Sequence, residues 1–227
     1  MSSHVLVPGA CHGGWWYRPV VDALESRGHR ARALTLAGLG PEGMSGAGQV
    51  TLDSHVEQTA AAVAEATEAS GGPVVLTGHS YGGAVITGAA DRAPERVAAL
   101  VYLDAFVPED GDSCWSMTSD EDRRWYIDGA GQTGLAVAPL PFFDERARPH
   151  PLATLVQRSR LTGAWRSVPV KVYVAATGWP PDMPPSPFTA TSRRLAADPA
   201  WTHQEWDTRH NVLAEGPERV LELLLAL

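Results

Sequence analysis

The sequence predicts an α/β fold in which helices cover both faces of a mostly parallel sheet. Short apolar runs bounded by Gly, Pro or Asp alternate with longer amphipathic stretches, a pattern typical of repeated β-α-β units. The chain has 227 residues and 44% apolar content, without a shift in composition along its length, so one core and a single domain spanning residues 1–227 are expected. The expected strands cover residues 5–7, 31–36, 74–77, 99–103, 170–175 and 202–206, and the expected helices cover 16–26, 52–68, 83–92, 186–196 and 217–225.

Two of these helices carry recognisable start signals. Thr51 can cap the helix that begins at residue 52, and Pro217 with Glu218 suits the first turn of the last helix. The stretch 105–167 breaks the alternation, because it mixes charged residues, Trp and Pro, and because glycines interrupt its helical pattern. We therefore expect a small helical cap over residues 105–167, inserted in the order of the sheet.

Charge and composition exclude several classes of partner. The net charge is −8, and the 18 basic residues are scattered, which argues against binding to nucleic acid. The N-terminus lacks the pattern of a secretion signal, and no stretch is apolar for the length of a membrane span, so a soluble, cytoplasmic protein is expected. Cys11 and Cys114 are too few for a disulfide scaffold and lack metal-ligand spacing, so both are expected to be reduced thiols. No metal and no organic cofactor are implied by the sequence. The oligomeric state stays open.

The strongest functional signal lies in the segment VVLTGHSYGG, residues 74–83. An apolar strand runs into Gly78-x-Ser80-x-Gly82, and a helix of small residues follows. Glycines beside the serine let the strand and the helix approach closely, so that the serine occupies a strained turn with its Oγ exposed above the sheet. This setting predicts a nucleophile elbow with Ser80 as the nucleophile.

The elbow resembles that of the α/β-hydrolase superfamily, and its GHSYGG form is similar to that of plant methylesterases, hydroxynitrile lyases and their bacterial relatives. The motif order matches from the first strand to the last helix, so the resemblance implies an α/β-hydrolase fold for nearly the whole chain. It also implies an oxyanion hole, with one donor at the backbone N–H of Tyr81. The loop PGACHGGW is similar to the HGACHGAW loop of the methylesterases, and it implies a second donor at the N–H of Ala10. We expect His12 to be a structural histidine.

The general base must be a neutral imidazole on a loop that can reach across the end of the sheet. His210 follows the last expected strand and precedes the last helix, where the family keeps its base. The side chain of His79, in the elbow, should point away from the nucleophile. The other histidines that lack a comparable setting are expected at the surface: His4, His29, His55, His150 and His203.

The triad acid has two candidates. Relatives usually place it after the penultimate strand, where this chain offers Asp182 among prolines, whereas Asp104 ends the preceding apolar strand. A carboxylate at that position is costly to bury without a partner, and His210 would be one. Asp104 is therefore the preferred acid, with Asp182 as the alternative.

Together these residues predict a serine hydrolase that acts on a carboxylic ester, thioester or lactone with a hydrophobic part, so a small hydrophobic molecule is the expected substrate. Tryptophans in the loops and the cap would line an apolar pocket. Gly9 and Asn211 stand where the resembling lyases have Thr and Lys, which argues against cyanohydrin cleavage. Two alternatives stay open on the same fold: a lyase, cyclase or carbon–carbon bond hydrolase acting on a polyketide-like natural product, and a ligand-binding protein without turnover.

Overall fold

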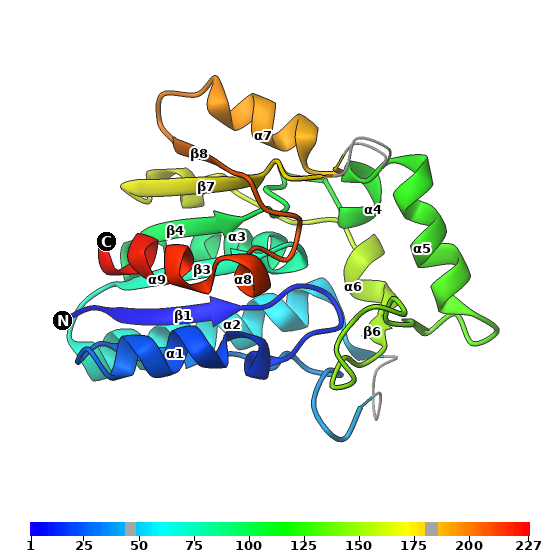
Figure 1. Cartoon of the computed structure of the whole chain (residues 1–227), viewed down its shortest axis with the longest axis horizontal. Helices are drawn as coiled ribbons and strands as arrows, with labels where there is room; N and C mark the ends of the chain where they lie inside the picture. The colour runs from blue at the N-terminus through cyan, green and yellow to red at the C-terminus, as the bar shows by residue number, and fades with distance from the viewer. Residues whose placement is uncertain (44–48, 180–185) are drawn as a thin grey trace.

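A parallel sheet forms the centre of the molecule. The computed structural model describes residues 1–43, 49–179 and 186–227. Within these residues the main sheet has six strands in the order β2-β1-β3-β4-β7-β8, and every neighbouring pair is parallel. The strands are β1 (Ser3–Val7), β2 (Arg30–Ala33), β3 (Val74–His79), β4 (Val97–Leu103), β7 (Val170–Ala176) and β8 (Thr202–Trp206). All of their carboxyl ends therefore meet at one edge of the sheet (Figure 1).

Alternating side chains of the strands build a core on each face of the sheet. Val5 and Val7 pack on one side with α2 (Leu52–Ser70), α3 (Tyr81–Arg92) and α7 (Thr189–Ala196). Leu6 points to the other side, where α1 (Arg18–Glu25), α8 (Val212–Glu215) and α9 (Pro217–Leu225) cover the sheet. This period-two division is the consequence of the β pleat, and it produces the three-layer α/β architecture that the sequence predicts.

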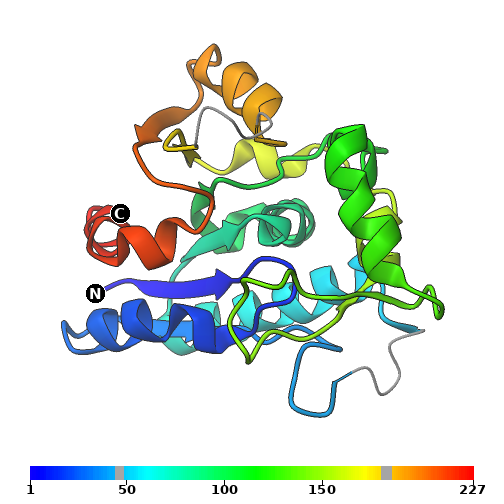
Figure 2. The same ribbon diagram turned by 45° about the vertical axis from the view of Figure 1, so that its right-hand side comes forward.

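A layer of short elements lies beyond the carboxyl ends of the strands. Between β4 and β7 the chain forms α4 (Cys114–Met117), α5 (Asp120–Ala130), β5 (Ala136–Val137), β6 (His150–Pro151) and α6 (Leu152–Val156). Strands β5 and β6 pair in antiparallel fashion as a small separate sheet. Figure 2 shows α5 standing across the end of the main sheet, and we call residues 105–167 the cap segment.

The observed elements follow the expected ones with local differences. Thr51 caps α2 as predicted, since its Oγ1 accepts the Ser54 N–H at 3.3 Å and the Ser54 Oγ accepts the Thr51 N–H in return. The first expected helix is divided, because a 3-10 turn (Gly14–Tyr17) precedes α1. Strand β2 ends at Ala33, three residues earlier than expected; the hydroxyl of Thr35 instead accepts the Gly14 N–H.

Candidate active site

Ser80 lies in a strained turn between β3 and α3. Its φ and ψ are 53° and −120°, a conformation that an L-residue rarely adopts. The turn is possible because glycines let the two elements approach: a Cβ at Gly78 would lie 2.6 Å from the Gly82 carbonyl oxygen. The carbonyl of Ser80 accepts the N–H of Gly83 at 3.0 Å and that of Phe106 at 3.1 Å. The elbow geometry that the sequence predicts is thus present, and the Ser80 side chain is half-buried.

Asp104 follows the last residue of β4, on the strand next to that of Ser80. It is 2% exposed and, like Ser80, has a positive φ, 43°. One carboxylate oxygen accepts the Ala176 N–H at 3.3 Å, and the other lies 2.7 Å from Nδ1 of His210. A buried carboxylate accepts hydrogen bonds, so Nδ1 carries the proton and Nε2 of His210 is left as the acceptor. That tautomer is the one that a general base requires.

Aromatic rings hold His210 on several sides. Phe188 stacks on it at 5.1 Å with an interplanar angle of 11°, and the ring of Trp179 lies at 6.2 Å. The ring of His79 lies at 4.6 Å, and its Nε2 donates to the carbonyl of His210 at 2.9 Å. His79, which was expected only to point away from the nucleophile, therefore anchors the loop that carries His210.

His79 can play this part because it stays neutral. It is buried between Trp16 and His210, with the Trp16 ring stacked at 4.4 Å. Burial, together with the neighbouring His210, lowers the pKa of His79 well below its usual value. A neutral ring has one N–H to donate, and here that N–H meets the His210 carbonyl, so no charge is introduced beside the candidate base.

The loop after β1 lies against the elbow. A Cβ at Gly9 would be 3.0 Å from the Cβ of Ser80 and 2.8 Å from Nδ1 of His79, so only glycine fits there. Ala10, the next residue, and Tyr81, which follows Ser80, therefore bracket Ser80 from two elements. Cys11 in this loop is buried, which raises the pKa of its thiol to about 12, and it does not offer a competing thiolate.

Three histidines that were expected at the surface are buried instead. His4 is 1% exposed and bonds to the Ser2 hydroxyl, whereas His55 and His150 are fully buried. His55 lies between the Tyr81 hydroxyl (2.8 Å) and the Ala37 carbonyl (2.9 Å). His55 bonds only to residues far away in the chain, and Nδ1 of His150 accepts the N–H of Cys11, 139 residues away, so no local pattern could have revealed the burial of these two rings.

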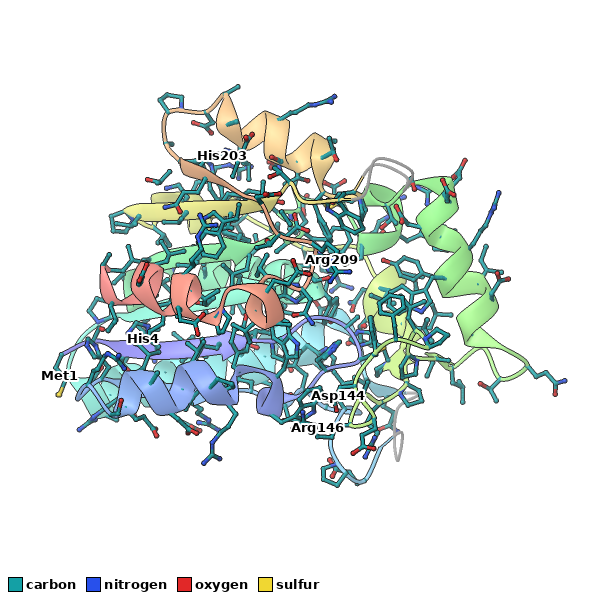
Figure 3. All side chains as sticks on the ribbon, in the orientation of Figure 1. Met1, His4, Asp144, Arg146, His203 and Arg209 are labelled. Atoms are coloured by element: carbon teal, nitrogen blue, oxygen red, sulfur yellow. The ribbon has the colours of Figure 1, made fainter. Side chains whose placement is uncertain are left out.

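Figure 3 labels residues that lie at opposite ends of the sheet. Arg209, which precedes His210, lies on the same side as Asp144 and Arg146 of the cap segment, whereas His4 and Met1 lie at the opposite end. The candidate residues are thus gathered at the carboxyl edge of the sheet, where ligands bind in open α/β folds. Asp182, the alternative acid, lies outside the described residues.

Comparison with known proteins identifies the family of this chain. Residues 5–223 match the alpha/beta hydrolase family. The chain belongs to this family. It is 35% identical, over the whole of both chains, to a carbendazim hydrolyzing esterase from Nocardioides sp.. It is also 41% identical to the rice esterase PIR7B, over 55% of this chain and 46% of that protein.

Solved structures share the fold of this hydrolase. An extracellular α/β-hydrolase from a Paenibacillus species superposes with a TM-score of 0.77 at 22% identity, covering 100% of this chain and 98% of the other. Polyneuridine aldehyde esterase gives a TM-score of 0.69 at 19% identity, covering 100% and 99%. In the described part of this hydrolase, none of the helices is long and apolar enough to cross a membrane.

Proposed function

We propose that this α/β-hydrolase cleaves carboxylic esters with Ser80 as nucleophile, His210 as general base and Asp104 as the acid that orients the imidazole. The observation that carries the proposal is the 2.7 Å contact between the buried Asp104 carboxylate and Nδ1 of His210. This contact leaves Nε2 free to accept a proton. The esterases among its relatives favour ester hydrolysis over the lyase, cyclase and binding alternatives.

The reaction follows from the chemistry of these groups. His210 Nε2 takes the proton of Ser80 as Oγ attacks the acyl carbon, and the negative charge collects on the acyl oxygen. The N–H groups of Ala10 and Tyr81 stabilise that oxygen. Collapse breaks the bond to the alcohol, which leaves with the proton from His210. Water then attacks the acyl-enzyme, again with His210 as the base, and releases the acid and free Ser80.

The substrate is a small ester with a hydrophobic part. Phe188 and Trp179 stack beside His210, and Trp16 stacks on His79, so aromatic surface adjoins the reacting groups. Aromatic rings supply apolar contact to a ligand with little loss of side-chain freedom. The Nocardioides relative makes carbendazim a useful assay compound beside simple p-nitrophenyl esters. A cytoplasmic location and the lack of a nucleic-acid partner stay predictions from the sequence.

Labelling with a fluorophosphonate probe tests the proposal. The probe reacts with activated serines, so the wild-type protein should be labelled and Ser80→Ala should not. Ser26→Ala, at an exposed serine of the α1 C-terminus, is the matched control and should be labelled like the wild type. Hydrolysis of p-nitrophenyl butyrate should follow the same order. Labelling that persists in Ser80→Ala, or a wild-type protein that is neither labelled nor hydrolytic, would refute the assignment.

A further inference from the structure

Hydrogen bonds from His12 and from His150 hold the two peptide groups that flank Ala10. The carbonyl of Gly9 accepts the His12 N–H at 3.3 Å. On the other side of Ala10, its own carbonyl accepts a hydrogen bond from Nδ1 of His12 at 2.7 Å. The N–H of the same Ala10–Cys11 peptide donates to Nδ1 of His150 at 3.1 Å. The orientation of the Ala10 N–H is therefore set by contacts on both sides.

His150 reaches this peptide from the cap segment, 139 residues away in the chain. It begins β6, and the neighbouring Arg148 donates its N–H to the Cys11 carbonyl at 2.9 Å. Cys11 has a φ of 66°, which is unfavourable for a residue other than glycine. The cap segment thus binds both the N–H and the carbonyl of Cys11, and these two hydrogen bonds stabilise its unfavourable positive φ.

The direction of each hydrogen bond around His150 is determined. Because Nδ1 accepts the Cys11 N–H, the ring proton must be on Nε2, which donates to Oγ1 of Thr154 at 2.9 Å. Thr154 in turn donates to the Pro151 carbonyl at 2.8 Å. The ring is fully buried, and burial with neighbouring histidines lowers its pKa well below the usual value, so it stays neutral. One tautomer is therefore fixed, and it presents an acceptor to the loop.

His150 also contacts the second expected donor residue. Its ring packs edge-on against that of Tyr81, at 4.6 Å, and the hydroxyl of Tyr81 pairs with His55 of α2. Other parts of the cap segment rest on the same loop, with Phe143 at 4.9 Å from the His12 ring and Arg146 at 4.2 Å over Trp15. One histidine of the cap segment thus contacts the peptide that follows Ala10 and the side chain of Tyr81, the two residues expected to supply the oxyanion donors.

We propose that His150 is a positioning residue for the oxyanion hole, which orients the Ala10 N–H through the Ala10–Cys11 peptide. This inference rests on the proposed function, since the oxyanion hole belongs to it. Without an acceptor at the Nδ1 position, the Cys11 N–H is buried and unsatisfied, and the peptide turns to find another partner. The Ala10 N–H then no longer points toward the acyl oxygen, although the hydrogen bond between Asp104 and His210 stays intact.

The test compares His150→Asn with His150→Gln. The Oδ1 of Asn can occupy the place of Nδ1 and accept the Cys11 N–H, whereas Gln reaches toward Thr154 and leaves the Nδ1 place empty. Loss of one oxyanion donor costs about 10²- to 10³-fold in rate, so His150→Gln should lose about 10²-fold in kcat for p-nitrophenyl butyrate. KM should change little, and His150→Asn should recover most of the loss. His203→Gln, at a partly exposed histidine of β8, is the control and should behave as wild type.

Two further measurements separate positioning from general damage. The pH profile of kcat/KM should keep its wild-type shape in both variants, because the His210 pair is untouched. The rate of fluorophosphonate labelling should fall with kcat in His150→Gln, since that reaction also develops charge on an oxygen. Equal kcat in the Asn and Gln variants, or a shifted pH profile, would overturn the inference and leave the ester hydrolase proposal standing.

A crystal structure of His150→Gln gives a readout that does not depend on activity. We expect the Ala10–Cys11 peptide to be rotated relative to the wild type. An Ala10–Cys11 peptide with the same orientation as in the wild type would overturn the inference, whether or not the wild-type protein hydrolyses esters. Failure of the proposed function is seen separately, because the fluorophosphonate probe would then not label Ser80 of the wild-type protein.

Discussion

Replacement of Asp104 by Asn is the most informative single change at the proposed site. Asn keeps the size of Asp and tolerates a φ of 43°, so the fold should survive. The Ala176 N–H, 3.3 Å from one carboxylate oxygen, needs an acceptor, and this requirement orients the Asn amide with its oxygen toward Ala176. The amide NH₂ then faces Nδ1 of His210 and donates to it, so the ring proton moves to Nε2.

The expected loss of activity in Asp104→Asn follows from that tautomer of His210. A His210 with its proton on Nε2 cannot accept the Ser80 proton, and a base in the wrong tautomer costs about 10⁴-fold in kcat. We expect a loss of about 10³- to 10⁴-fold here, which corresponds to about 4 to 5.5 kcal/mol of transition-state stabilisation. The assay is kcat/KM for p-nitrophenyl butyrate at several pH values, with circular dichroism to confirm folding.

Asp182→Asn provides the comparison, because Asp182 is the rival acid. It should keep wild-type activity if Asp104 orients His210. Activity of Asp104→Asn within about tenfold of wild type would refute the reasoning, since a wrong tautomer cannot have so small an effect. Loss of activity in Asp182→Asn alone would move the acid to that residue.

Three further predictions concern stability. Gly82→Ala should destabilise the protein by about 1 to 3 kcal/mol in urea unfolding, because its Cβ would overlap the Val7 carbonyl, whereas Gly72→Ala, with open space around it, should change little and would expose a general effect of alanine. Asp91→Ala should cost about 1 to 3 kcal/mol, since the Asp91 carboxylate accepts three hydrogen bonds from the segment before β7; a melting temperature equal to that of wild type would contradict this. The pKa of His55 is lowered from 6.5 to about 4 by burial, so it stays neutral in the fold while the unfolded chain binds a proton. The contribution of neutral His55 to the free energy of unfolding is therefore present above pH 6.5 and is lost as the pH falls to about 4. The loss amounts to about 3 kcal/mol, and His55→Gln should remove it from the pH dependence of unfolding.

The parts of the site that local sequence could predict are those whose physical requirements are local. The elbow needs a strand, a turn with glycines and a helix within ten residues, and the segment around Ser80 contains all three. Asp104 could be inferred because a charged group at the end of an apolar strand needs a partner. Thr51 could be recognised as a cap because its contacts lie within three residues. The assignment of these residues to catalysis stays a proposal.

The contacts that the sequence did not reveal join segments that are far apart in the chain. His150 and Cys11 have no pattern in common, and only the folded cap segment brings them together. His55 lies on an amphipathic helix where a histidine suits the solvent face equally well, and the Tyr81 hydroxyl that stabilises its burial is 26 residues away. His79 was recognised as part of the elbow, but its bond to the His210 backbone crosses 131 residues.

The pairing of β3 with β4 has a consequence for how this enzyme can diversify. His79 and Leu103 face each other in register, so the residues that follow them, Ser80 and Asp104, leave neighbouring strands at the same level. Adjacent strands are held about 4.8 Å apart by the backbone ladder whatever side chains they carry. The spacing of two of the three proposed triad members is thus set by the hydrogen-bonded backbone of the sheet. With the acid proposed at Asp104, the chain beyond β7 need not supply one, and its length and composition can change as new substrates are selected.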